Sequence, residues 1–125
     1  MIKQILLVGM GGGLGSALRY LTSLWTEPYN TGLFPLATFT VNILGCLFMG
    51  LLLGVFGQYT QEYQSLRLLL VTGFCGGYTT FSAFASENIN LLEHHHFGTA
   101  VLYTLSSILI GCLAIGLGFF LMKQL

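Results

Sequence analysis

Long apolar runs, separated by short clusters of polar and charged residues, dominate the sequence. Four of these runs are long enough to cross a membrane as helices, and we place them at residues 4–25, 35–57, 66–92 and 97–122. A hydrocarbon core about 30 Å thick requires roughly 20 helical residues. None of the runs shows the alternation of apolar and polar positions that is typical of membrane β-strands. The pattern predicts an all-α integral membrane protein, with four transmembrane helices in a single domain over residues 1–125.

Composition excludes a soluble globule. Only 6% of the 125 residues are charged and 54% are hydrophobic, whereas soluble domains carry about 25% charged residues. Four Lys and Arg residues against four Asp and Glu residues offer no basic face, so no nucleic-acid partner is expected. The three cysteines are scattered within apolar runs and have neither disulfide nor metal-ligand spacing. No nucleophile–base or metal constellation is apparent, which argues against an enzyme.

The loops give a weak indication of orientation. Four spans place Lys3, Arg67 and Lys123 on one side, which favours both termini in the cytoplasm. Residues 94–96 are three consecutive histidines before the fourth span. We interpret them as a solvated turn, with metal binding as the alternative.

Seventeen glycines suggest close helix packing. Pairs spaced by four residues allow helix backbones to approach each other in a membrane. These pairs are Gly9/Gly13, Gly11/Gly15, Gly50/Gly54 and Gly73/Gly77.

The third span contains a stretch that is unfavourable for a helix. Gly76 and Gly77 are followed by the β-branched Thr79 and Thr80, and both residue types have low helix propensity. We therefore predict that the third helix is broken mid-membrane. Backbone groups freed by such a break are tolerated only inside protein or along a wet cavity, and half-helix ends of this kind hold ions in transporters.

Several polar side chains lie within the spans, where each is costly. Arg19 either extends to the nearer surface or is buried, pairing with Glu87 or lining a vestibule. Thr38 and Asn42 lie one helical turn apart, and Asn42 acts either in a pore or in helix–helix contact. The fourth span adds further hydroxyl-bearing residues at Tyr103, Thr104, Ser106 and Ser107.

Phe81 and Phe84 lie three residues apart, directly after the unfavourable stretch. The edge of a phenyl ring is electropositive, so a ring pair near hydroxyl and amide donors is suited to a small anion that must also be released. The alternative is that the two rings pack as core.

Three segments resemble the Fluc/CrcB family of fluoride channels: Gly12 to Tyr20 (GGLGSALRY), Thr38 to Asn42 (TFTVN) and Gly73 to Glu87 (GFCGGYTTFSAFASE). The resemblance covers essentially the whole chain. It implies a multi-pass channel of the bacterial inner membrane that passively exports cytoplasmic fluoride and so reduces its toxicity. It also implies an antiparallel, dual-topology dimer in lipid, with two pores at the subunit interface.

The same resemblance assigns the fluoride pore. Phe81 and Phe84 would form the ring pair that lines it, Asn42 would donate into it, and Thr38 would lie nearby. The other residues matched to the fluoride path are Thr80, Ser82, Tyr103 and Ser107.

Three further assignments are implied by the resemblance. The backbone carbonyls of Gly76 and Thr79, from both subunits, would hold a central structural Na⁺. Arg19 and Glu87 match the family's charged residues, with structural or vestibule roles.

The fourth span departs from the family pattern, because the hydroxyl residues expected beyond Ser107 fall near Gly111 and Ile115. That departure fits a subunit of a two-chain pair, although a homodimer is favoured. Two other functions fit the sequence less well. A small four-span drug or cation exporter needs a carboxylate in the first span, and none precedes Glu27. A non-transporting assembly subunit does not explain a broken third span.

Overall fold

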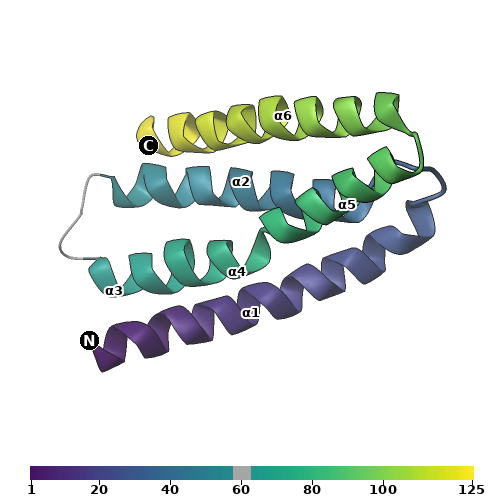
Figure 1. Cartoon of the computed structure of the whole chain (residues 1–125). Coiled ribbons are helices and arrows are strands. Elements are labelled where there is room, and N and C mark those ends of the chain that lie inside the picture. Colours follow the sequence, from purple (N-terminus) through teal and green to yellow (C-terminus); the bar gives the residue numbers. More distant parts are fainter. Residues whose placement is uncertain (58–62) are drawn as a thin grey trace.

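The computed structural model of the chain describes residues 1–57 and 63–125. The helical segments form four rods, over residues 2–29, 36–56, 64–93 and 97–123, which lie side by side (Figure 1). In chain order the elements are α1 (Ile2–Thr26), η1 (Glu27–Tyr29), α2 (Leu36–Phe56), α3 (Gln64–Arg67), η2 (Leu68–Cys75), α4 (Gly76–Tyr78), α5 (Phe81–Glu93) and α6 (Phe97–Lys123).

Four helical segments are long and apolar enough to cross a membrane. They are Ile2–Tyr29, Leu36–Phe56, Gln64–Glu93 and Phe97–Lys123. Over residues 1–57 and 63–125, the prediction of an all-α chain with four helices able to span a membrane is therefore confirmed. Both chain termini and α3 lie at the same end of the molecule (Figure 1), as an even number of spans requires.

Local sequence explains several helix ends. Pro28 lies in the first turn of η1, and Pro35 precedes α2 with φ −72°. Proline is favoured at helix starts because it lacks the amide that would be unpaired there. Helix α5 ends at Glu93; two residues later His95 has φ 61°, and the next amide, of His96, donates to the Leu91 carbonyl at 2.8 Å. A left-handed residue followed by this long bond is a Schellman end, which is usually made by glycine.

Two pairs of rods make the closest contacts: α1 with η2 and α4, and α2 with α6. A side chain on Gly11 would collide with the Leu69 carbonyl, and one on Gly77 with the backbone of Gly12. Between α2 and α6, a side chain on Gly50 would collide with the Ile115 carbonyl. These glycines are needed because backbone lies where a Cβ would be.

Three of the four predicted glycine pairs form these contacts, and one does not. Gly15, Gly54 and Gly73 likewise face backbone of the neighbouring rod. No atom of the described residues lies within 4 Å of a Cβ added at Gly9 or Gly13, so this pair makes no close helix contact within that part of the chain. The step of two positions from Gly9 to Gly11 corresponds to about 200° around a helix, and it is the Gly11/Gly15 face that meets η2.

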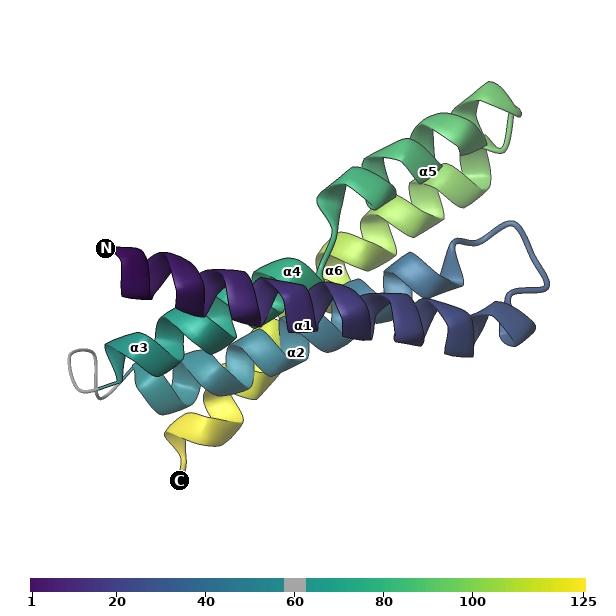
Figure 2. The same cartoon turned by 90° about the horizontal axis from the view of Figure 1, so that it is seen from below.

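The third rod is not a uniform α-helix. Its segment η2 is a π-helix over Leu68–Cys75, in which bonds run from i to i+5. After α4 the chain is extended at Thr79, with φ −75° and ψ 157°, and at Thr80, with φ −146° and ψ 119°. Beyond these two residues α5 departs from α1 and lies beside the first half of α6 (Figure 2).

Candidate functional site

The extended residues Thr79 and Thr80 organise the site. In a continuous helix the Thr80 amide would donate to the carbonyl four residues back. Instead it donates to Asn42 Oδ1 on α2 at 2.8 Å, and Asn42 Nδ2 donates to the Thr80 carbonyl at 3.1 Å. The Thr80 hydroxyl then caps α5 by accepting from the Ala83 amide at 3.3 Å. One side chain on α2 and one hydroxyl therefore satisfy groups that the extended backbone leaves without helical partners.

A groove of about 310 Å³ lies beside this stretch. It brings together six residues that the sequence assigned to the pore or the cation: Asn42, Thr79, Thr80, Phe81, Phe84 and Ser107. The remaining lining residues are Gly45, Cys46, Met49 and Ile108. None of the ten carries a formal charge, so an ion in this groove would meet only dipoles and ring edges.

The two phenyl rings form one wall of the groove. The ring centroids of Phe81 and Phe84 lie 5.8 Å apart at an interplanar angle of 38°. Phe84 also contacts the Tyr103 ring at 5.0 Å. Phe81 is 78% exposed, so most of its surface is left uncovered by the described residues of this single chain.

Ser107 and Ser82 differ in their surroundings. The Ser107 hydroxyl is buried and has no hydrogen-bond partner among the described residues, which leaves a donor available in the groove. Ser82 is exposed, and its hydroxyl lies 3.3 Å from that of Thr80. Ser82 does not line the groove.

A second polar cluster centres on Glu87. Its Oε1 accepts from the Thr38 hydroxyl at 2.6 Å, and its Oε2 accepts from the Tyr103 hydroxyl at 2.7 Å. The carboxylate therefore joins α2, α5 and α6. Glu87 is absent from the lining of the groove beside Phe81, which keeps its charge away from that surface.

Arg19 lines a separate groove of about 300 Å³ between α1, α2 and α5. Its guanidinium donates to the Ser16 hydroxyl at 3.4 Å, and Ser16 donates to the Gly77 carbonyl at 3.4 Å. Thr38 and Thr80 line the same groove. Within the described residues the side-chain bond of Arg19 is to Ser16, and both oxygens of Glu87 accept from other groups.

The carbonyls of Gly76 and Thr79 share one property. In a continuous helix the Gly76 carbonyl would accept from the Thr80 amide, which instead donates to Asn42. The Thr79 carbonyl would likewise accept from the Ala83 amide, which instead donates to the Thr80 hydroxyl. Both carbonyls therefore lose the partner that a continuous helix would supply. Gly76 is also exposed, with open space where a Cβ would be. Uncharged carbonyl oxygens of this kind suit a hard cation such as Na⁺.

Two cross-helix hydrogen bonds near the site were not expected from the sequence. The Thr22 and Tyr78 hydroxyls lie 3.0 Å apart and join α1 to the end of α4. The Thr104 hydroxyl donates to Asn88 Oδ1 at 2.9 Å and joins α6 to α5. The sequence offered one indication of the bond between Thr104 and Asn88: Asn88 lies one helical turn after Phe84 and so shares its helix face.

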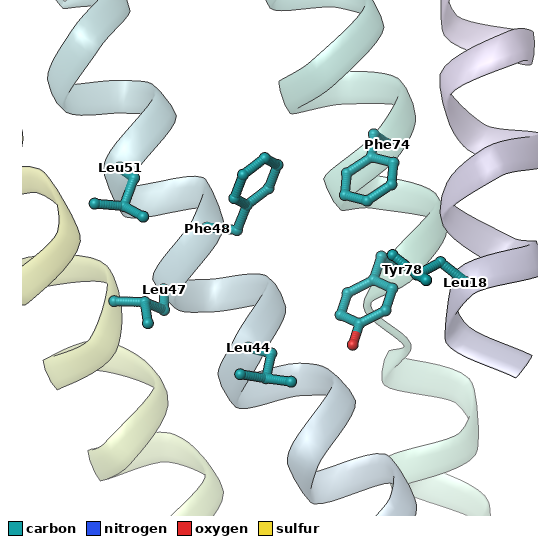
Figure 3. Close-up of a pocket in the computed structure, with 7 residues that line it drawn as sticks. All are labelled: Leu18, Leu44, Leu47, Phe48, Leu51, Phe74 and Tyr78. Atoms are coloured by element: carbon teal, nitrogen blue, oxygen red, sulfur yellow. The ribbon is translucent and has the colours of Figure 1, made fainter. Parts of the chain in front are cut away.

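A third groove, of about 340 Å³, is apolar (Figure 3). Its lining comes from α1, α2, η2 and α4 and consists of Leu18, Leu44, Leu47, Phe48, Leu51, Phe74 and Tyr78. The polar atom visible there is the Tyr78 hydroxyl, which is bonded to Thr22. This surface offers little to coordinate an ion, in contrast to the groove beside Phe81.

Comparison with known proteins identifies the family of the chain. A family model described as CrcB-like protein, Camphor Resistance (CrcB), matches residues 6–119. The chain belongs to this family. The resemblance inferred from the three sequence segments is thus confirmed.

Named relatives of the CrcB-like chain cover nearly its whole length. The fluoride-specific ion channel FluC of Azobacteroides pseudotrichonymphae genomovar. CFP2 is 46% identical over 121 residues, which are 97% of each chain. The fluoride-specific ion channel FluC of Flavobacterium psychrophilum is 45% identical over 124 residues, 99% of this chain and 100% of that protein. The protein of the same name from Methylobacillus flagellatus is 45% identical over 122 residues, 97% of this chain and 95% of that protein.

Proposed function

We propose that this chain is a fluoride-selective ion channel that passively exports cytoplasmic fluoride and thereby reduces its accumulation and toxicity. The observation that carries the proposal is the groove in which the Phe81 and Phe84 rings lie beside Asn42 and Thr80. Relatives at 45–46% identity that carry the name fluoride-specific ion channel support it. As a passive channel the chain catalyses no chemical reaction and is not an enzyme.

Anion recognition in this groove rests on neutral groups. Ring edges of Phe81 and Phe84 present positive partial charge, and the Ser107 hydroxyl has no competing partner among the described residues. Asn42 uses one amide hydrogen on the Thr80 carbonyl and retains a second hydrogen for an anion. A site without formal charge binds fluoride weakly enough to release it, which conduction requires.

The assigned site residues outside this groove fall into three groups. Thr38 and Tyr103 hold the Glu87 carboxylate, so they act at the edge of the path and keep this negative charge out of the groove lining. Arg19 lines the neighbouring groove with Thr38 and Thr80, where a guanidinium attracts anions toward the path. Ser82 supplies a further hydroxyl at the exposed surface.

The channel is an antiparallel, dual-topology homodimer in this proposal, with a paired homologous chain as the second possibility. Phe81 is 78% exposed and Gly76 and Ser82 are also exposed, so the described residues of one chain leave the path open on one side. Thr79 and Thr80 lie at the centre of the membrane-long segment Gln64–Glu93. Non-helical backbone at mid-membrane depth must be buried in protein or line a wet cavity. A second subunit meets both requirements.

A structural Na⁺ at the dimer centre would be held by the Gly76 and Thr79 carbonyls of both subunits. The two carbonyls fit the ion because their helical amide partners donate elsewhere. When bound, the cation supplies positive charge at the subunit interface. The chain's own contribution is to keep these carbonyls free through the Asn42 and Thr80 hydrogen bonds.

The proposed location is the bacterial inner membrane, where a passive path lets fluoride leave the cytoplasm. The four long apolar helices support a multi-pass membrane protein. Exposed side chains such as Leu113, at 71%, provide the surface that contacts lipid.

The alternatives are not favoured. A small drug or cation exporter needs an intramembrane carboxylate in its first span, whereas α1 carries Arg19 and no acidic residue. A non-transporting assembly subunit gives no reason for a groove that combines ring edges with a buried hydroxyl that has no partner among the described residues.

Fluoride efflux from liposomes tests the proposal. Purified chain is reconstituted in vesicles loaded with potassium fluoride or potassium chloride, and a potassium ionophore starts the efflux. We expect rapid fluoride release and negligible chloride release. Equal release of both ions, or of neither, would overturn the proposed function.

A further inference from the structure

The position of α5 depends mainly on α6. Beyond Thr80, α5 departs from α1 and lies beside the first half of α6 (Figure 2). Phe84 is carried on this segment, and its ring is 5.8 Å from that of Phe81 and 5.0 Å from that of Tyr103. Whatever fixes α5 on α6 therefore fixes the orientation of the Phe84 ring.

A chain of two hydrogen bonds connects α6 to the backbone of Phe84. The Thr104 hydroxyl donates to Asn88 Oδ1 at 2.9 Å, and Asn88 Nδ2 donates to the Phe84 carbonyl at 3.0 Å. Asn88 and Thr104 are half-buried. Hydrogen bonds in such low-dielectric surroundings are stronger than in water, and a lost partner is costly.

The Tyr103 hydroxyl donates to the neighbouring Glu87 carboxylate at 2.7 Å, which gives α5 a second hydrogen bond to α6. Consecutive residues project about 100° apart around a helix. Bonds from both Glu87 and Asn88 to α6 therefore restrict rotation of α5 about its own axis, which a single bond would not do.

We propose that Asn88 and Thr104 are positioning residues that hold the Phe84 ring with its edge toward the fluoride path. This inference rests on the proposed function. Ring-edge attraction depends on orientation, because the face of a phenyl ring is negative and its edge positive. Rotation of α5 would turn the wrong part of the ring toward the anion.

The test replaces Thr104 and measures flux and ring order separately. Thr104→Val removes the hydroxyl at nearly constant volume, and Thr104→Ser keeps it. We expect Thr104→Val to lower fluoride efflux about fivefold, the factor that corresponds to one typical hydrogen bond, and Thr104→Ser to stay within about twofold of wild type. In fluoride-free buffer, the ¹⁹F resonance of 4-fluorophenylalanine at position 84 should broaden or split in Thr104→Val and stay sharp in Thr104→Ser.

Ser106→Ala is the matched control, because the Ser106 hydroxyl bonds the Tyr103 carbonyl of its own helix. It should leave flux and the resonance unchanged. Should Thr104→Val fail to assemble, Asn88→Leu removes both bonds of the connection and takes its place. Wild-type flux or an unchanged resonance in Thr104→Val would overturn the inference. An equal loss of flux in Ser106→Ala would overturn it as well. If the wild type conducts no fluoride, the proposed function fails, and the resonance still decides the positioning role.

Discussion

Asn42 and Thr80 exchange two hydrogen bonds, one in each direction, between α2 and the extended residues before α5. The carboxamide matches an amide and a carbonyl at once because it carries both a donor and an acceptor. Among uncharged side chains, only the longer Gln offers the same pair of groups in one carboxamide. The pair therefore couples the conformation of the third rod to α2.

Asn42→Asp should abolish fluoride flux, with a loss of at least about a hundredfold. The carboxylate cannot donate to the Thr80 carbonyl, and a buried group without its partner costs about 1–3 kcal/mol. It also places a negative charge in the groove that the anion would occupy. Liposome efflux measures the loss, and gel filtration shows whether the variant retains the oligomeric state of wild type. Asn90→Asp, on the exposed part of α5, is the matched control, and wild-type flux in Asn42→Asp would remove Asn42 from the path.

Phe81→Ile should also abolish flux while the oligomer persists. Isoleucine keeps much of the apolar volume but lacks an electropositive edge. Phe120→Ile makes the same change at an exposed position on α6, where the side chain is 59% accessible, and should conduct as wild type does. Comparable efflux from the two variants would show that the Phe81 ring takes no part in conduction.

Replacing Na⁺ by a large organic cation should weaken dimer assembly or reduce fluoride efflux. The reason is that the Gly76 and Thr79 carbonyls would then face each other across the interface without a compensating charge. Returning Na⁺ should restore both. Dimer content and efflux that do not respond to Na⁺ would exclude the cation site and leave the channel itself unaffected.

Tyr78→Phe and Thr22→Val should each destabilise the chain by about 0.5–1.5 kcal/mol, the worth of a typical hydrogen bond. The double variant should lose little more than either one, because both remove the same 3.0 Å contact. Denaturant titration in detergent gives the free energies of unfolding, and Thr22→Ser should retain most of the stability. Additive losses would mean that the two hydroxyls do not interact.

The number of membrane-spanning helices followed from the sequence because helix length in a bilayer is set by hydrocarbon thickness, a local constraint on each run. Glycine contacts were predicted less completely. The four-residue spacing found Gly11/Gly15, but the same spacing at Gly9/Gly13 lies on a face that meets no neighbour among the described residues. Spacing alone does not state which face of a helix its neighbour covers.

The cross-helix hydrogen bonds were the least predictable feature. Thr104 bonds Asn88, and Glu87 binds Thr38 and Tyr103 where Arg19 had been one candidate partner. Such pairs depend on the rotation of each helix about its axis and on the direction of α5 after Thr80. Neither quantity can be derived from apolar run lengths or from propensities.

The most direct test of the central claim is the reversal potential of the current carried by the purified chain in a planar bilayer. With a tenfold fluoride gradient and equal chloride on both sides, the account predicts a current that reverses near the fluoride equilibrium potential and does not shift when chloride is varied. A reversal potential that follows chloride, or the absence of any current, would contradict it.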